Sequence, residues 1–350
     1  GKKVKNSIQL NEGVFNYLNS NRVFYWFANN GLSANDPSSG GNGLYWSDDG
    51  SIGKGTIFAD GLVWGGIVNG LVSCGGSTYR TGMIPGPYPK ENEFIDRTSS
   101  KYRIYKIRKD LNNVPQNLVW QYKKDYDEWP VELGAPWIDV NGDGVFTKGV
   151  DEPEILGDET AWFVMNDSDT TQSMFIYGAP PMGLEVQVTL WSFDHFNFLG
   201  DAVFRKYKII NKGNSEIKDM YVGIWSDPDL GGATDDFVGC DTSLSLGYSY
   251  NGLDVDEVYG IPPAAGYVLL ETPTVDSRND SALINGNWKK GYKNLPLTGF
   301  SFYIGGSAIY MDPSMGVIRG SHELYNQMQG KIWDGSPYID PTTGDTTNFC

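Results

Sequence analysis

The sequence predicts a mainly β protein, an antiparallel β-sandwich with long loops and few short helices. Aromatic residues make up 14% of the 350 residues, and their side chains fit the pleated surface of a sheet. The chain also contains 44 glycines and 18 prolines, a composition that favours many short strands joined by tight turns. Its apolar runs are short or alternate with polar residues, which is the pattern of strands. Together these features favour sheets packed on sheets over helical folds.

Residues 1–133 are expected to form an N-terminal β-rich region. Its clearest feature is a hairpin, because Asn69-Gly70 separates two apolar runs and both residues tolerate a positive φ angle. The aromatic run at 23–27 is expected to be a buried strand. The remaining elements expected here are a lead-in strand or arm in 1–20, a long loop over 29–55, hairpin strands at 57–68 and 71–74, a half-exposed strand at 102–109 and a short helix over 120–126.

Residues 134–350 are expected to form a β-sandwich region that carries an acidic loop and continues beyond the chain end. Alternation over 185–193 predicts a strand with one polar face. A polar turn at 211–215 separates two apolar runs, which predicts that the strands at 203–210 and 220–225 pair. Further strands are expected at 162–165, 244–250, 266–270, 300–304 and 307–311, and a helix at 322–329 that Ser321 caps and Gly330 ends.

The most specific chemical motif begins at Asp139. Oxygen-bearing side chains occupy alternate positions, Asp139, Asn141 and Asp143, and Gly144 follows them. In a calcium loop this spacing points three side chains at one centre, the glycine makes a sharp turn, and the carbonyl of Val145 adds a further oxygen. We therefore expect these residues to bind Ca2+.

The motif resembles the calcium loops of EF-hands and dockerins over residues 139–144 only. Val150 stands where those loops supply a bidentate carboxylate, and the proline-containing flanks are not helical. We expect a calcium loop between β elements, with Asp151 as its closing ligand. The alternative is a turn rich in Asn and Asp that binds no ion.

A second acidic cluster follows the strand at 220–225. It consists of Asp227, Asp229, Asp235 and Asp236, followed by Asp241. These carboxylates could form a second, weaker metal site, or the paired carboxylates of a glycosidase, or a solvated acidic loop. Sequence alone does not give the separation of the carboxylates, so the three interpretations stay open.

Other classes of function find little support. The formal net charge of −16 makes nucleic acid and anionic lipid poor partners, and no apolar stretch is long enough for membrane insertion. A catalytic triad would need His195 or His322, and neither lies near a nucleophile motif. Cys74 and Cys240 could form a disulfide or stay as thiols. The sequence thus favours a protein without catalytic activity.

Aromatic side chains could instead form a platform on which sugars stack. The tryptophans considered for this role are Trp46, Trp64, Trp120, Trp129, Trp288 and Trp333, although packing in cores and at sheet edges accounts for most aromatic residues of a β domain. A binder or enzyme would need an aromatic-lined cleft with carboxylates. A self-assembling protein would need large flat surfaces or open strand edges.

Several phrases of the sequence carry a resemblance to a known group. They lie at residues 57–70, 133–144, 222–231, 238–252 and 259–267, the second being Leu133-Gly-Ala-Pro-Trp-Ile-Asp-Val-Asn-Gly-Asp-Gly. Together they resemble uncharacterised large secreted proteins of Bacteroidota and Ignavibacteria that are exported by the type IX secretion system. Segment 206–225 resembles the immunoglobulin-like modules of such proteins, and a jelly-roll-like sandwich is the related alternative. The C-terminal sorting domain typical of the group is not found in this chain.

The resemblance implies an extracellular or cell-surface location after signal-peptide removal, and it implies no activity. We therefore expect a secreted, calcium-stabilised protein with a structural or adhesive role, including self-assembly. Its partners would be copies of itself, other cell-surface proteins or polysaccharide. The alternative is an extracellular component that binds polysaccharide or degrades glycosides.

Overall fold

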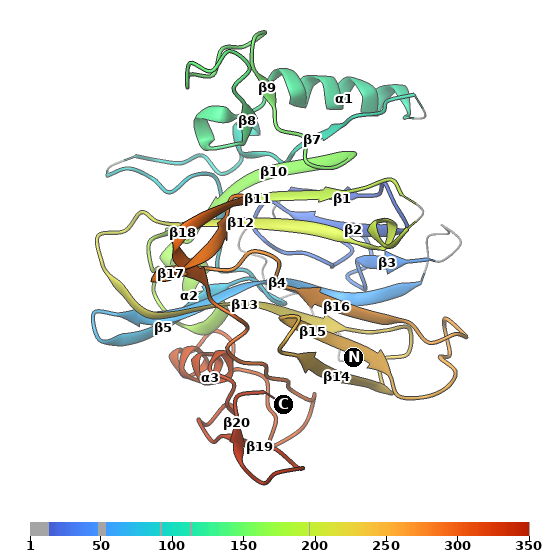
Figure 1. Cartoon of the computed structure of the whole chain (residues 1–350), viewed down its shortest axis with the longest axis vertical. Coiled ribbons are helices and arrows are strands. Elements are labelled where there is room, and N and C mark those ends of the chain that lie inside the picture. The colour runs from blue at the N-terminus through green and yellow to red at the C-terminus, as the bar shows by residue number, and fades with distance from the viewer. Residues whose placement is uncertain (1–13, 48–53, 92, 113, 196, 350) are drawn as a thin grey trace.

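Two antiparallel sheets packed face to face form the centre of the molecule (Figure 1). The computed structural model describes residues 14–47, 54–91, 93–112, 114–195 and 197–349. The expected fold class, mainly β with few short helices, is confirmed.

The first sheet has the strand order β1-β2-β3-β4-β13, and β5 also pairs with β4. The hairpin expected at Asn69-Gly70 joins β4 to β5, with φ angles of 51° and 82° at the two turn residues. The strands are β1 (Phe15–Leu18), β2 (Val23–Ala28), β3 (Leu44–Trp46), β4 (Gly55–Val68), β5 (Leu71–Gly76) and β13 (Ile217–Pro228).

The second sheet has the order β12-β11-β10-β6, and β7 also pairs with β10. The strands are β6 (Ile84–Pro85), β7 (Tyr105–Arg108), β10 (Glu159–Asn166), β11 (Leu184–Ser192) and β12 (Val203–Asn211). Both faces of β10 and most of β11 are buried, because one face packs into the sandwich and the loops near residue 133 cover the other. The alternating pattern in β11 therefore does not mark a solvent-exposed face.

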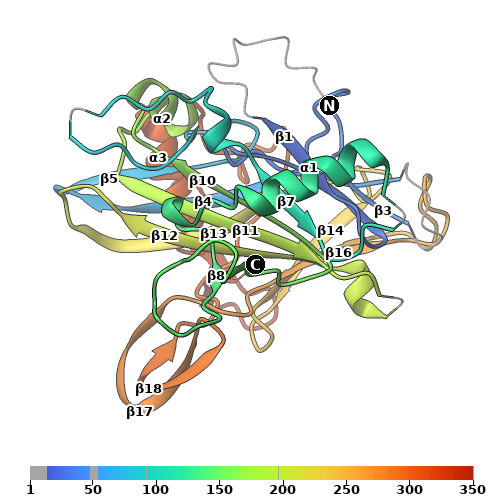
Figure 2. The same ribbon diagram turned by 90° about the horizontal axis from the view of Figure 1, so that it is seen from above.

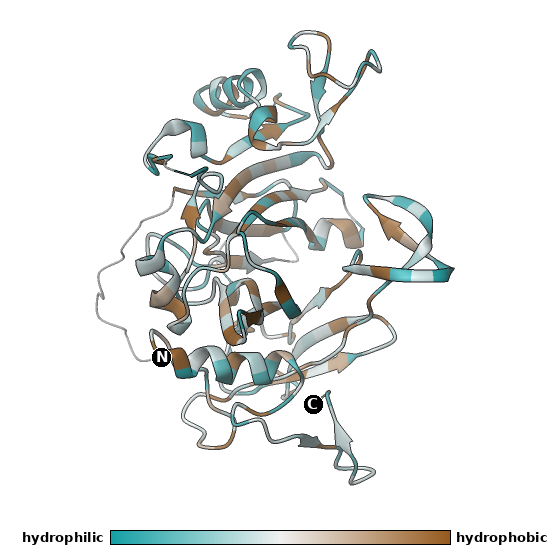
Figure 3. Ribbon diagram, turned by 90° about the vertical axis from the view of Figure 1, so that its left-hand side faces the viewer, coloured by the Kyte–Doolittle hydropathy of each residue, from teal (hydrophilic) through white to brown (hydrophobic). Residues whose placement is uncertain are grey.

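The core lies between the two sheets. Buried side chains of β2 and β4 meet those of β10 and β11, and the Phe27 and Phe163 rings stack with centroids 6.2 Å apart across the interface. In Figure 3 brown, the colour of apolar residues, is most continuous on the central ribbons, whereas the outlying segments mix teal, white and brown. Burial of this apolar area is the main stabilising contribution to the fold.

A buried ionic group lies inside this core. Asp60 of β4 forms a 2.9 Å ion pair with Arg205 of β12, and their side chains are 1% and 10% exposed. The Asp60 carboxylate also accepts hydrogen bonds from the Tyr25 hydroxyl at 2.8 Å and the Tyr267 hydroxyl at 2.9 Å. The two sheets are therefore tied together by charge as well as by apolar contact.

Smaller sheets surround the sandwich. Tyr267 belongs to one of them, so its bond to Asp60 anchors that sheet to the core. The hairpin β17–β18 projects away from the other elements (Figure 2). The strands are β8 (Trp137–Ile138), β9 (Glu152–Pro153), β14 (Asp236–Asp241), β15 (Leu246–Asn251), β16 (Ala264–Val268), β17 (Thr274–Ile284), β18 (Asn287–Asn294), β19 (Tyr338–Ile339) and β20 (Thr346–Thr347).

Three α-helices and three short 3-10 helices complete the described part of the chain. They are α1 (Gln116–Asp127), α2 (Thr170–Tyr177), α3 (Ile318–Met328), η1 (Ser100–Tyr102), η2 (Val131–Leu133) and η3 (Phe198–Asp201). Helix α1 lies over β7 at the top of Figure 1, so β7 is buried although its pattern predicted a half-exposed strand. Helix α2 was not expected; Asp169 caps it through a 2.8 Å bond from the Gln172 N–H.

Two expectations about chain topology are wrong. The strands at 203–210 and 220–225 do not pair, because β12 joins the second sheet and β13 joins the first. The turn between them therefore crosses from one layer of the sandwich to the other. The boundary expected between residues 133 and 134 does not separate the sheets either, because β13 pairs with β4 and β10 pairs with β7.

Three local expectations also need correction. Residues 300–304 and 307–311 form a closed loop, in which Ser307 accepts the Tyr310 N–H and Phe302 packs on Tyr310 with ring centroids 4.7 Å apart. Ser321 lies inside α3 and donates to the Tyr177 carbonyl, so it is not the cap. The expected loop at 29–55 contains β3. The lead-in arm lies mostly outside the described residues, apart from β1.

Candidate functional site

The acidic loop at 139–151 connects β8 to β9, which pair as a two-stranded hairpin (Figure 1). Its flanks are therefore β elements, as the sequence predicted. The Trp137 and Phe146 rings meet edge to face, with centroids 5.5 Å apart, and close the base of the loop. The loop is thus held at both ends by β pairing and apolar contact.

Hydrogen bonds fold the acidic side chains back over the turn. The Asp139 carboxylate accepts the Gly142 N–H at 2.7 Å and the Gly144 N–H at 2.8 Å. Asp143 accepts the Val145 N–H at 2.7 Å through one oxygen and the Asn141 amide at 2.8 Å through the other. These contacts bring the three predicted side chains together on one turn.

Glycine is required at both sharp points of this turn. Gly142 and Gly144 have φ angles of 75° and 76°, in the left-handed region that other residues adopt only with strain. The winding expected of a calcium loop is therefore present in the backbone.

Asp151 closes the loop from the other end. Its carboxylate accepts the Val140 N–H at 2.9 Å and the Thr147 N–H at 2.6 Å, and the residue is 5% exposed. It thus ties the two ends of the loop together by hydrogen bonds. Its expected role as a metal ligand stays a prediction.

The oxygen atoms of this loop are the type of ligand that a hard cation such as calcium prefers. Asp139, Asn141 and Asp143 offer oxygens, and each carboxylate oxygen keeps acceptor capacity beyond the one bond that it makes. Within the described part of the chain, no group of three or more His, Cys, Asp or Glu side chains is arranged to hold a metal ion. A calcium site here would therefore depend on the Asn141 amide and the Val145 carbonyl as well as on carboxylates.

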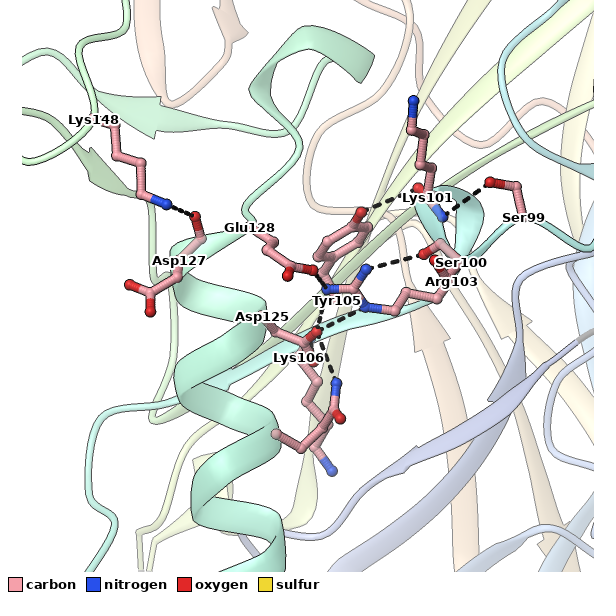
Figure 4. A network of polar contacts seen from close by, with 11 residues as sticks. Ser99, Ser100, Lys101, Arg103, Tyr105, Lys106, Asp125, Asp127, Glu128 and Lys148 are labelled. Atoms are coloured by element: carbon pink, nitrogen blue, oxygen red, sulfur yellow. Dashed lines mark hydrogen bonds and ion pairs between the residues drawn. The ribbon is translucent and has the colours of Figure 1, made fainter.

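The loop is also attached to α1. Lys148 donates from its ammonium to the Asp127 carbonyl at the last turn of the helix, at 2.6 Å (Figure 4). A small apolar cluster, which includes Tyr105, Trp129 and Trp162, joins β7 and β10 to the segment between α1 and the loop. The order of the loop is therefore coupled to the packing of α1 on the second sheet.

In the second acidic cluster, the charge of Asp229 acts on Asp227 and the charge of Asp236 acts on Asp229. Asp227 accepts the Tyr79 hydroxyl at 2.8 Å, and burial together with the nearby charges of Asp229 and Asp312 raises the pKa of Asp227 to about 6. Asp236 instead accepts the Leu230 N–H at 3.0 Å. Tyr79 and Asp312 are distant in sequence, so no local pattern could have predicted their place here.

An aromatic cleft lies between β1–β2 and α1. Its volume is about 250 Å³, and its aromatic wall contains Phe15, Tyr17 and Trp26. The Tyr17 and Trp26 rings meet edge to face with centroids 5.1 Å apart. Helix α1 supplies the opposite wall through Leu118, Gln121, Tyr122 and Asp125.

Lys106 of β7 also lines the cleft and is 2% exposed. Its ammonium forms a 2.7 Å ion pair with the buried Glu159 and donates to the Tyr17 carbonyl at 2.5 Å. It also lies 4.3 Å from the centroid of the Tyr17 ring. Burial lowers the pKa of Lys106, and the charge of Glu159 opposes that change. The lysine therefore fastens the edge strand β1 to the second sheet.

Asp125 of α1 is held by a second ionic network (Figure 4). Arg103 bonds to Asp125 at 2.9 Å and to Glu128 at 2.8 Å, and the Gln121 amide donates to Asp125 at 3.0 Å. This network positions α1 and orients the Gln121 side chain beside the cleft.

The cleft does not use the tryptophans considered from the sequence. Trp64 and Trp129 are buried, whereas Trp120 and Trp288 are 63% and 73% exposed on open surface. The cleft uses Trp26, which belongs to the run expected to be fully buried. The sequence carried no signal for this, because every residue of the run 23–27 is apolar. Only the structure shows that Val23, Tyr25 and Phe27 are buried while the residues between them are half-buried.

The cysteines and helices add two observations. Cys74 and Cys240 do not form a disulfide, and the Cys74 thiol donates to the Ser321 carbonyl at 3.2 Å. In the described part of the chain, no helix is both long and apolar enough to cross a membrane.

Comparisons with known proteins identify no relative: no family model, no curated protein and no solved structure matches this chain.

Proposed function

We propose that this protein is a secreted, calcium-stabilised β-sandwich module of a cell-surface or extracellular protein, exported by the type IX route, with an adhesive or structural role. In this role it binds other copies, surface proteins or polysaccharide and catalyses no reaction of its own. The observation that supports the proposal is the acidic loop at 139–151, where three oxygen-bearing side chains gather on one turn that two glycines wind tightly.

Calcium would act by neutralising charge in the loop. Asp139 and Asp143 place two carboxylates on one short turn of a chain whose net charge is −16, and a bound cation offsets their repulsion. Extracellular calcium modules bind with dissociation constants of roughly 0.1–1 mM. A loop of that affinity is filled outside cells, which agrees with the proposed location.

The first testable prediction is that calcium raises the melting temperature of the protein. Binding to the folded state alone adds about 2.7 kcal/mol to the free energy of unfolding when calcium exceeds its dissociation constant about 100-fold. Thermal unfolding is measured with calcium, with the chelator EGTA, and with magnesium in place of calcium. Asp139→Asn is expected to remove most of the difference between the calcium and EGTA curves.

Asp340→Asn is the matched control for this experiment. Asp340 also accepts two backbone N–H groups in an exposed turn, at 2.7 Å from Thr342 and 3.3 Å from Thr343, but its surroundings lack the calcium spacing. Its variant should keep the full response to calcium. If EGTA leaves the melting temperature of the wild-type protein unchanged, the loop is a turn without an ion and the proposal fails.

Polysaccharide binding is favoured as a second candidate function by the aromatic cleft. It combines aromatic rings with a few polar side chains, a lining typical of sites for small organic ligands.

A further inference from the structure

We propose that the cleft between β1–β2 and α1 is a binding site for one uncharged pyranose ring of a glycan. The inference rests on the second candidate function above, polysaccharide binding, and narrows its ligand; it depends neither on the ion nor on export. It follows from five properties of the cleft: the pairing of its charges, the occupied backbone groups of its strand edge, its amide groups, its aromatic wall and its size.

The charges of the cleft are already paired. Lys106 is bonded to Glu159 at 2.7 Å, and Asp125 is bonded to Arg103 at 2.9 Å. No other lining residue is charged. An anionic or cationic ligand would have to break one of these buried pairs, which is costly because it leaves an uncompensated charge. The site therefore selects an uncharged ligand.

The strand edge in the cleft is not open to an added peptide strand. An extended peptide would need the outward backbone groups of β1. The Tyr17 carbonyl already accepts the Lys106 ammonium at 2.5 Å, and the Tyr17 N–H donates to the Asn16 side chain at 2.8 Å. With these two groups occupied, a strand of four residues has too few free backbone groups to form a ladder of hydrogen bonds with a peptide. Binding of an extended peptide is therefore disfavoured.

Two amides give the cleft its polar specificity. The Gln121 Nε2–H donates to Asp125 at 3.0 Å, and the Asn16 Oδ1 accepts the Tyr17 N–H at 2.8 Å. Each bond fixes one end of its amide. Within the described part of the chain, the Gln121 Oε1 and the Asn16 Nδ2 make no further hydrogen bond. One acceptor and one donor among the lining residues thus stay available, and sugar hydroxyls can both donate and accept hydrogen bonds.

The aromatic wall and the size complete the match. A pyranose has one apolar face of C–H groups, which packs on aromatic rings such as Tyr17 and Trp26. A volume of about 250 Å³ lies just below the roughly 300–1,000 Å³ of sites for larger organic ligands. The cleft therefore accommodates a single ring, such as the end or a side branch of a polysaccharide.

The experiment uses the whole chain and isothermal titration calorimetry. The probes are the neutral hexasaccharides of β-1,4-glucose, β-1,4-mannose and α-1,4-glucose, with hexagalacturonate as the anionic probe. Concentrations reach about 10 mM, because a site for one ring binds at roughly millimolar concentrations. At least one neutral probe is expected to bind, and hexagalacturonate is not.

Variants locate the binding. Gln121→Ala is expected to weaken it at least 5-fold, since one of two directing groups is lost, and Trp26→Leu is expected to abolish it. Trp120→Leu is the matched control, because Trp120 lies on the same helix, is 63% exposed and does not line the cleft. It should bind as the wild type does. Melting curves establish that each variant is folded, and Gln121→Ala decides the outcome if Trp26→Leu unfolds.

The inference is overturned if no neutral probe binds, if hexagalacturonate binds in preference, or if Gln121→Ala binds as tightly as Trp120→Leu. Every sugar titration is run both in calcium and in EGTA. If calcium does not change the melting temperature, the calcium-stabilised role fails, but the titrations still show whether the cleft binds sugar.

Discussion

At the scale of single residues, the Asp60–Arg205 pair is a buried ionic link between the two sheets of the sandwich. Arg205→Met removes the only cationic partner that Asp60 has among the described ion pairs, while Tyr25 and Tyr267 still donate hydrogen bonds. Breaking a buried pair in this way costs about 3–5 kcal/mol, because a charge is left buried without compensation. We expect urea denaturation to show a loss of that size in the free energy of unfolding.

Arg22→Met is the control for that substitution. Arg22 pairs with Asp201 at 2.5 Å, but their side chains are 23% and 37% exposed, so the loss is expected to stay near or below about 1 kcal/mol. Equal losses for the two variants would contradict the importance of the buried pair.

Asp227 gives the protein a pH dependence of known sign. Burial raises its pKa from 3.8 to about 6 in the folded protein, so the folded state binds more protons than the unfolded chain between these values. The contribution of this group to the free energy of unfolding is therefore at its maximum below about pH 4. It decreases as the pH rises to about 6 and is absent above that pH, a total decrease of at most about 3 kcal/mol.

Asp227→Asn should remove that fall, because asparagine does not titrate and can still accept the Tyr79 hydroxyl bond. The measurement is the difference in free energy of unfolding between wild type and variant from pH 4 to about pH 8. Asp241→Asn, in an exposed turn where hydrogen bonds from Ser243 lower the carboxyl pKa, should not reproduce the change. A constant difference across the range would show that the pKa of Asp227 is ordinary.

Local spacing predicts residue-scale features well only when the partners are neighbours in the chain. Asp139, Asn141 and Asp143 meet because a few turn residues separate them, and the two glycines dictate the winding. The cleft joins Trp26 to Gln121, and Asp227 meets Asp312. Those contacts arise from the packing of distant elements, which no window of sequence contains.

At the scale of elements, the hairpin β17–β18 is weakly attached to the sandwich, by an exposed 3.1 Å bond from the Lys206 ammonium of β12 to the Asn285 side chain. It pairs with no other strand of the described chain, and it projects outward in Figure 2. Thr274 and Asn294 face each other at its base, so a linker of four Gly and Ser residues can replace the segment 274–294. We expect this deletion to change stability by less than about 1 kcal/mol, a shift in melting temperature of roughly 2 °C.

The contrasting change is Tyr267→Phe in β16. It removes the hydroxyl that bonds to Asp60 at 2.9 Å and to Ser226 at 3.0 Å, and so releases the anchor of a neighbouring sheet. A loss of about 1–3 kcal/mol is expected, because Asp60 is then left with one buried donor fewer. If the hairpin deletion lowers the free energy of unfolding more than Tyr267→Phe does, the hairpin contributes to the core of the sandwich.

Turn chemistry predicted where strands turn but not always which strands pair. Asn69-Gly70 marked the β4–β5 hairpin correctly, and Asn285-Gly286, with φ angles of 51° and 72°, turns β17 into β18 in the same way although that hairpin was not predicted. The turn at 211–215 carries similar residues but crosses between layers. A polar turn fixes a reversal of direction, whereas the partner is chosen by the sheet that buries each apolar face.

At the scale of the whole molecule, the two sheets form one folding unit although the sequence suggested two regions. Strand β4 lies before residue 134 and pairs along most of its length with β13, which lies after it. The core likewise needs Phe27 from one side and Phe163 from the other. Composition changes near residue 134 because the acidic loop begins there, and that surface feature does not mark a boundary of the core.

The last prediction is that fragments 1–133 and 134–350 do not fold separately, while the full chain unfolds in one cooperative transition. Each fragment would expose one face of the sandwich and leave either Asp60 or Arg205 unpaired, which no local contact offsets. Calorimetry and amide hydrogen exchange on the separate fragments test this against the intact chain. A cooperative transition in fragment 134–350 alone would instead mean that β10, β11 and β12 are stable without β4, and that the pairing of β4 with β13 forms on an already folded sheet.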